Sequence, residues 1–270
     1  MGLLTEDLSL RIERALSLAA QSRLSHVQEL PGNPLGIEMR HWDCVSANLV
    51  RRDVLYYRHF NSVREVRRGD EVHVDGALTW FRSQDKACTV HLCPEANEVL
   101  RDHLEQGGLR QSWLMAVMCA TPVAIEPRPT DVDVQASRGP SESFLTLWLD
   151  GTPPEERDFL RRVALAEFAD WHCYVAFVEA RPVAFAALYP CDAIGVMASA
   201  WTAPEFRGRG CQTALLRERI NHTAEAGMDL VVSHAAPGSA SQRNMERLGL
   251  QVAYTEAIWA ISDPNPSAIS

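Results

Sequence analysis

At 270 residues the chain exceeds the roughly 100–150 residues of a typical domain, so the sequence predicts one large domain or two small ones. Hydrophobic residues make up 46% and charged residues 23%, which excludes general disorder and allows a sizeable core. The formal net charge is −9 and Lys86 is the only lysine. Non-specific binding to nucleic acid or to an anionic membrane is therefore not expected, because both need a positive surface.

Residues 1–18 predict an amphipathic helix that stays on the protein. Their apolar residues recur at helical spacing, and acidic residues stand where a secretory signal carries positive charge. No stretch of the chain approaches the roughly 20 apolar residues of a membrane span. The seven cysteines show no CxxC spacing. We therefore expect free, mostly buried thiols, no metal site and a soluble cytoplasmic protein.

The rest of the N-terminal half shows a weaker pattern. Residues 56–61 are aromatic and polar; we interpret them as a half-buried strand, with the alternative that they line an acceptor cleft. Residues 69–76 are acidic and would repel a phosphate. A strand at 89–93, a helix at 94–106 and a strand at 113–118 follow.

Prolines mark a junction between two structured patterns. Pro122, Pro127 and Pro129 lie close together, so we place a domain boundary near residue 128. The predicted domains are residues 1–128 and 129–270.

The C-terminal half alternates apolar strands with helices. The expected elements are a strand at 132–135, helices at 141–150 and 154–169, a hairpin of strands at 172–178 and 183–189, a strand at 194–202, a helix that begins in 207–212 and ends before Gly227, a strand at 230–234, a helix from Ser239 to Gly249, and a strand at 252–261. Both halves share the order strand, proline, helix, Gly-Leu, strand. We therefore suspect two related folds in tandem.

The segment from Arg207 to Gln212, which begins Arg-Gly-Arg-Gly, predicts an anion site. Its glycines let several backbone N–H groups point inward, and the following helix adds the partial positive charge of its N-terminus. Such a cradle suits a pyrophosphate. The glycine spacing fits neither the dinucleotide fingerprint nor the P-loop.

The order of elements and two motifs resemble the GCN5-related N-acetyltransferase superfamily. Residues 207–212 are similar to its pyrophosphate motif Q/R-x-x-G-x-G/A, and residues 237–250 to its second cofactor segment. The resemblance covers residues 131–260. It implies an α/β fold with a mixed, mostly antiparallel sheet flanked by helices, in tandem domains of which the C-terminal one is intact and the N-terminal one degenerate.

The same resemblance implies an acyl-CoA, most simply acetyl-CoA, as the cofactor. Backbone N–H groups of residues 209–213 would hold the pyrophosphate, and residues 201–203 would pair with the pantetheine amides like an added strand. A backbone N–H of that strand could polarise the thioester carbonyl. The implied cofactor-binding residues are Trp201, Thr202, Ala203, Arg207, Gly208, Arg209, Gly210, Cys211, Gln212, Thr213, Ser241 and Asn244.

Two positions depart from the family pattern. Gln212 replaces a Gly or Ala, which a helix N-terminus tolerates if the side chain points outward. Met245 stands where many members carry a tyrosine that protonates the leaving thiolate. Tyr254 is the candidate replacement, with an ordinary strand aromatic as the alternative interpretation.

His234 is the candidate general base. It ends a predicted strand where strands of this fold separate, and an imidazole titrates near neutral pH. A histidine that only bonds the adjoining loop is the alternative. Cys211 is not expected to act as a nucleophile, because the family transfers the acyl group directly.

The leading functional hypothesis is an N-acyltransferase that acts on the amine of a small molecule held between the two domains. The competing hypotheses are a non-catalytic acyl-CoA sensor and an acyltransferase that uses a protein or a carrier-protein-bound substrate. The sequence does not identify the acceptor or the oligomeric state.

Overall fold

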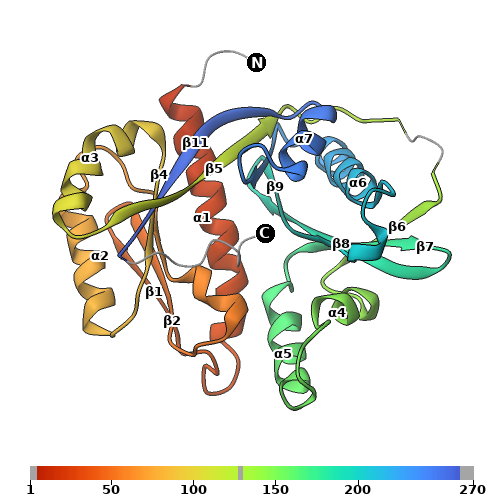
Figure 1. The fold of residues 1–270 in the computed structure, drawn as a ribbon, viewed down its shortest axis with the longest axis horizontal. Coiled ribbons are helices and arrows are strands. Elements are labelled where there is room, and N and C mark those ends of the chain that lie inside the picture. The colour runs from red at the N-terminus through yellow and green to blue at the C-terminus, as the bar shows by residue number, and fades with distance from the viewer. Residues whose placement is uncertain (1–4, 127–129, 262–270) are drawn as a thin grey trace. The chain divides into compact units, whose positions relative to one another are not determined.

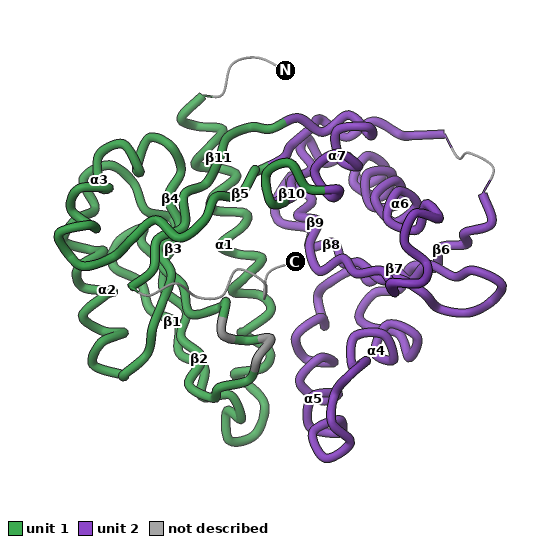
Figure 2. Tube along the Cα trace, in the orientation of Figure 1, with its two compact units in different colours: residues 1–117, 235–239, 252–270 green, residues 118–234, 240–251 purple. Residues whose placement is uncertain are grey.

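The chain forms two compact units in the computed structural model, which describes residues 5–126 and 130–261 (Figure 2). Unit 1 comprises the described parts of residues 1–117, 235–239 and 252–270, and unit 2 comprises those of 118–234 and 240–251. None of the helices in these ranges is both long and apolar enough to cross a membrane.

The two units differ from the two predicted halves of the sequence. The junction predicted at residue 128 lies outside the described residues. Strand β5 (Arg110–Ala120) begins in unit 1 and ends in unit 2, and β11 (Gln251–Ala260) does the reverse. Hydrogen bonding explains why most of β11 belongs to unit 1. It forms an antiparallel ladder with β4 of that unit, in which Ala257 lies opposite Leu92.

Unit 1 is an α/β fold with the strand order β1-β2-β3-β4-β11-β5 (Figure 1). Its further elements are α1 (Glu6–Gln28), β1 (Ile37–Trp42), β2 (Val45–Val50), the 3-10 helix η1 (Leu55–Phe60), β3 (Ser62–Arg64), α2 (Glu71–Ser83), β4 (Thr89–Leu92) and α3 (Pro94–Gln106). The predicted N-terminal helix is confirmed: the Thr5 hydroxyl accepts a hydrogen bond from the Leu8 N–H and caps it. β3 and β4 are parallel, whereas β1–β2, β2–β3 and β4–β11 are antiparallel.

Helices cover both faces of this sheet. Ser46 of β2 bonds Ser17 of α1 at 2.9 Å, so α1 lies on the face to which Ser46 points. Trp42 lies opposite Val45, on the other face, and its indole is the nearest group to Gly76 of α2. The alternation of side chains along β2 therefore separates the α1 side from the α2 side.

The segment 56–61 was predicted as a strand, and this prediction is wrong for its first five residues, which belong to η1. β2 already has β1 on one side and β3 on the other, so the chain between β2 and β3 has no free edge on which to form a strand. The backbone turns instead, and the Tyr57 N–H donates to the Val54 carbonyl at 2.8 Å.

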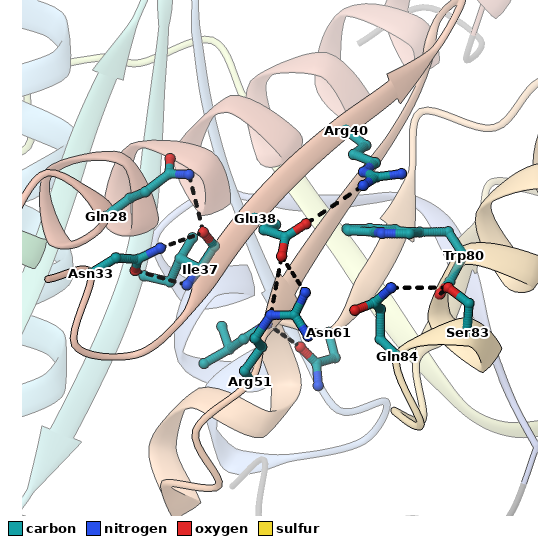
Figure 3. A network of polar contacts seen from close by, with 11 residues as sticks. Gln28, Asn33, Ile37, Glu38, Arg40, Arg51, Asn61, Trp80, Ser83 and Gln84 are labelled. Carbon is teal, nitrogen blue, oxygen red and sulfur yellow. Dashed lines mark hydrogen bonds and ion pairs between the residues drawn. The ribbon is translucent and has the colours of Figure 1, made fainter.

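Charged side chains cover β1, the edge strand of the sheet (Figure 3). Arg51 Nε donates to Glu38 Oε1 at 3.0 Å, and the Arg40 guanidinium lies 3.7 Å from the same carboxylate. Arg40 also lies over the Trp80 ring, 4.7 Å from its centroid. Charges on an edge strand oppose pairing with another chain.

Unit 2 has the strand order β10-β9-β8-β7-β6. Its elements are β6 (Val132–Arg138), α4 (Glu142–Trp148), α5 (Pro154–Glu167), β7 (His172–Val178), β8 (Arg181–Cys191), β9 (Ile194–Thr202), the 3-10 helix η2 (Pro204–Phe206), α6 (Cys211–Glu225), β10 (Leu230–Ala235) and α7 (Ala240–Arg247). These confirm the strands and helices predicted for this half. Figure 1 shows α6 on one side of the strands and α4 with α5 on the other.

Helix α6 lies unusually close to β9. A Cβ added to Gly195 would come within 2.6 Å of the Thr223 hydroxyl, so only glycine permits this approach. The fully buried Arg219 donates to the Leu215 and Ala187 carbonyls, which fixes the helix to β8. Contacts in the middle of α6, well beyond its first turn, therefore fix the position of the helix.

The two units repeat one order of elements, which confirms the tandem fold. β3, α2, β4, α3 and β5 follow each other as β9, α6, β10, α7 and β11 do. In each series the first two strands pair in parallel, through Val63 and Val90 in unit 1 and through Val196 and Val232 in unit 2. The mixed, mostly antiparallel α/β class is confirmed as well.

Unit 1 buries a cluster of ionisable side chains between α1 and its sheet. The Tyr254 hydroxyl donates to Glu13 Oε1 at 2.5 Å. Glu256, which is 0% exposed, lies 3.4 Å from Arg64 Nη1 and 3.1 Å from His91 Nδ1. Burial, together with the nearby Glu256, raises the pKa of Glu13 to about 8.

We predict that Glu13→Gln stabilises the protein increasingly as the pH rises from about 4.5 to about 8. Over this window the unfolded chain has released the Glu13 proton and the folded chain must retain it, so the wild type loses stability. The Gln side chain does not ionise and still accepts the Tyr254 hydrogen bond. The difference in unfolding free energy should grow by up to about 1.4 kcal/mol per pH unit, measured by denaturant titration.

The control is Glu6→Gln, which changes an exposed acid of the same helix and should leave the pH dependence unaltered. A Glu13→Gln difference that stays constant with pH would show that Glu13 does not hold a proton in the folded state.

Candidate active site

The loop that precedes α6 has the conformation of an anion cradle. Gly208 and Gly210 adopt φ angles of +79° and +87°, in the left-handed region. The first helical hydrogen bond joins the Ala214 N–H to the Gly210 carbonyl, so the N–H groups of residues 211–213 precede the helical ladder. Free N–H groups and the helix dipole together favour a bound anion. The loop is exposed, and a Cβ on either glycine would meet nothing within 4 Å.

Both arginines of the loop lie beside this cradle. Arg207 Nε donates to the Thr202 carbonyl at 3.4 Å. Arg209 forms an ion pair with Asp131, which holds the pKa of that carboxyl below its usual range, and it lies over the Phe206 ring. Two positive charges therefore remain next to the N–H groups, although the Arg209 charge is shared with an acid.

The second predicted cofactor segment contacts the loop directly. Gln212 Nε2 donates to Ser241 Oγ at 3.0 Å, and Asn244 Nδ2 donates to Gln212 Oε1 at 2.5 Å. The Gln212 side chain therefore lies toward the helix that carries Ser241 and Asn244, which supplies two partners for it. The structure brings all three predicted residues together.

Strand β9 contains a β-bulge that the sequence did not reveal. Ala198 lies opposite Ala187 and Trp201 opposite Phe185, so Ser199 and Ala200 together face one residue of β8. Ser199 has a φ of +51°, which is uncommon for a residue other than glycine. The bulge interrupts the ladder in the strand expected to bind pantetheine.

The two parallel strands β9 and β10 separate at the level of this bulge. Their register ends at the pair Val196–Val232. One residue further, the Ser233 hydroxyl donates to the Met197 carbonyl at 2.9 Å and bridges the start of the gap. His234, the candidate base, comes next along β10 and is half-buried. The structure thus places His234 on the strand edge that separates from β9.

The remaining residues of the predicted pantetheine strand pair on one edge only. Trp201 and Thr202 lie opposite Phe185 and Ala184 of β8, and the Ala203 N–H donates to the Val183 carbonyl at 2.9 Å. Within residues 130–261, the ladder with β10 does not extend past Val196. The other edge of β9 is thus the one on which an extended ligand could add.

Tyr254 lies in unit 1, whereas the cradle lies in unit 2. Its hydroxyl donates to Glu13, and burial together with that carboxyl raises its pKa above the usual range. A phenol that releases its proton less readily and is committed to a buried carboxyl suits a structural role. Met245 is 4% exposed and belongs to the core.

Two further residues have environments that argue against catalysis. Cys211 is buried, and burial raises the pKa of its thiol, which disfavours the nucleophilic thiolate. His172 packs against the His222 ring, 4.2 Å between centroids, and burial lowers its pKa. Within residues 5–126 and 130–261, no three His, Cys, Asp or Glu side chains gather as a metal site would require.

Comparison with known proteins matches residues 140–250 to a family model. The sequence model of the acetyltransferase (GNAT) family matches residues 140–250, which include β9, the cradle and α7. No curated protein matches the chain. Residues 140–250 therefore match an acetyltransferase domain of the GNAT family, which supports an acyltransferase activity for this part of the chain.

Solved structures share the fold of the whole chain. A GCN5-related N-acetyltransferase from Kribbella flavida is 18% identical, with a TM-score of 0.64 over 94% of this chain and 99% of that one. A tandem GNAT protein from the clavulanic acid biosynthesis pathway is 11% identical, with a TM-score of 0.62 over 96% of both chains. A GCN5-related N-acetyltransferase from Sphaerobacter thermophilus is 18% identical, with a TM-score of 0.56 over 80% of this chain and 76% of that one. The likeness shows a tandem fold that extends over both units.

We predict that Gly210→Val weakens CoA binding at least about tenfold, or ~1.4 kcal/mol. A Cβ at this position meets nothing within 4 Å, so the cost comes from the φ of +87° and from the space that the anion needs. Isothermal titration calorimetry measures the effect, and circular dichroism checks the fold.

Gly151→Val is the matched control. Gly151 has a φ of +75° and equally open surroundings, but it lies in the turn between α4 and α5. It should cost stability without changing CoA affinity. Equal CoA affinity in wild type and Gly210→Val would move the anion site away from this loop.

Proposed function

We propose that the protein is an acyl-CoA-dependent N-acyltransferase that transfers an acetyl group directly from acetyl-CoA to the amine of a small molecule. The observation that carries the proposal is the cradle of residues 208–213, which follows η2 and the bulged strand β9, whose ladder with β10 ends at Val196. A pyrophosphate on the cradle and an extended pantetheine along β9 need these two features side by side.

The backbone of unit 2 supplies the contacts for the donor. The N–H groups of residues 209–213 would hold the pyrophosphate, with the charges of Arg207 and Arg209 beside it. Residues 201–203 would bind the pantetheine amides. An N–H at the bulge of Ser199 and Ala200 would stabilise the oxyanion that forms when the amine attacks the thioester carbon.

The reaction then needs one proton removed and one supplied. The amine nitrogen forms the new C–N bond, the C–S bond breaks, and the sulfur leaves as a thiolate. We assign removal of the amine proton to His234, directly or through a water, because it lies on the separating edge of β10. Since Met245 is apolar and Tyr254 is bonded to Glu13, solvent protonates the thiolate.

The free and mostly buried thiols support a cytoplasmic location for this chemistry. Six of the seven cysteines are buried, and Cys44 is half-buried. Burial raises the pKa of five of the thiols, those of Cys44, Cys88, Cys93, Cys119 and Cys211. Protonated, mostly buried thiols suit a reducing compartment.

The proposal predicts release of free thiol from acetyl-CoA that depends on an added amine. A thiol-detecting assay against amines, amino acids, aminoglycosides and a lysine-containing peptide tests it. Turnover with small amines supports the proposal, and turnover with the peptide alone assigns a protein substrate instead. Measurable CoA affinity without turnover on any acceptor would contradict the proposed transfer and indicate a CoA-binding module.

On an accepted amine, His234→Ala should lower the transfer rate by roughly 10²–10⁴-fold, the usual size of general-base catalysis, and leave CoA affinity nearly intact. Tyr254→Phe is the matched control. It removes the hydrogen bond to Glu13, so it should lower stability and leave the rate within about threefold of wild type. A His234→Ala rate above about a third of wild type would exclude His234 as the base.

A further inference from the structure

We propose that Gln212 is a positioning residue, which holds the first turn of α6 in the orientation that binds the donor's pyrophosphate. The proposal rests on the function proposed above. Its basis is that the Gln212 side chain forms hydrogen bonds with α7. The family resemblance leads one to expect only Gly or Ala at this motif position.

The side-chain amide of Gln212 is bonded at both ends to α7. Its Nε2 donates to Ser241 Oγ at 3.0 Å, and its Oε1 accepts from Asn244 Nδ2 at 2.5 Å. Asn244 is fixed in turn, because Arg247 Nη1 donates to its Oδ1 at 2.7 Å. Gln212, Ser241 and Asn244 are all half-buried, so these bonds are partly protected from water. The result is a short polar network from the first turn of α6 to the end of α7.

The loop that precedes α6 has few other contacts to hold it. Gly208 and Gly210 have open surroundings, and the Arg209–Asp131 ion pair is exposed. Exposed ion pairs contribute little rigidity. The buried contacts of the helix begin at Cys211 and continue through residues 214–216, on the face that packs on the sheet. Gln212 is therefore the residue that fixes the cradle on the side toward α7.

This arrangement changes the role of two predicted cofactor contacts. Ser241 and Asn244 were expected to contact the cofactor, but in this structure each forms a hydrogen bond with the Gln212 side chain. They act on the donor through Gln212, by fixing the direction of the N–H groups of residues 211–213. Donors fixed in advance bind an anion more strongly than donors that must be ordered on binding.

The network and the family motif predict opposite results for one substitution. If a small residue at this position serves to give the phosphate room, Gln212→Ala should bind CoA as well as the wild type or better. If the hydrogen bonds position the cradle, Gln212→Ala should bind CoA about three- to tenfold more weakly, the range expected for one or two lost neutral hydrogen bonds.

The experiment measures CoA affinity by calorimetry, and KM and kcat where an acceptor is known, on the full chain. We expect the loss in Gln212→Ala to appear in the dissociation constant and in KM for the acyl donor, and not in kcat. Gln212→Met, which keeps the length of the side chain without its hydrogen bonds, should lose as much affinity as Gln212→Ala. The double variant Gln212→Ala, Asn244→Ala should bind no more weakly than Gln212→Ala, since both changes break the same bond.

Gln242→Ala is the matched control, because Gln242 is the next residue after Ser241 and its side chain bonds Glu246 within α7. It should bind CoA like the wild type. The proposal is overturned if Gln212→Ala and Gln212→Met both bind CoA as tightly as the wild type, or if the Gln212 and Asn244 losses add independently. Absence of CoA binding by the wild type would overturn the proposed function as well, so the two failures are distinguishable.

Discussion

The separation of β9 from β10 is the constraint on which the site depends. Parallel strands that stay paired leave no edge for a ligand, whereas here the ladder stops at Val196 and Val232 and the Ser233 hydroxyl bridges the gap to Met197. Beyond that point β9 keeps β8 on one edge only, and the bulge at Ser199 disturbs even this ladder. The cradle follows the same strand along the chain, after η2, and we propose that one extended molecule uses both.

Unit 1 repeats the order of elements but fills the corresponding places with its own charges. After the parallel pair Val63–Val90, the next residues of the two strands are Arg64 and His91, and both contact the buried carboxylate of Glu256. Where unit 2 has free N–H groups before α6, unit 1 has Asp70 before α2, and its carboxylate accepts the Arg67 N–H at 2.8 Å. A protein carboxylate thus occupies the position of an anion, and a bound phosphate there would meet a like charge.

Much of this could be predicted from the sequence, for identifiable reasons. The cradle could be predicted because its signs, the glycines of residues 207–210 and the apolar face of the following helix, stand next to each other in the sequence. The structure has the expected left-handed glycines. The bulge could not be predicted, since neither Ser199 nor Ala200 is a residue type that favours a left-handed backbone. The partners of Gln212 and Tyr254 depend on contacts with residues far along the chain, Ser241 and Glu13, which no spacing rule reports. The passage of β5 and β11 from one unit to the other likewise depends on which strands pair, and the sequence pattern does not report this.

We propose that unit 2 binds one acyl-CoA at its cradle and that unit 1, in its described residues, has carboxylates at the corresponding place. Calorimetric titration of the intact chain with CoA tests this claim most directly, because it counts sites without reference to an acceptor or to turnover. We expect a single site per chain. Two sites of comparable affinity per chain would contradict it, since the charges of unit 1 would then not exclude the phosphate.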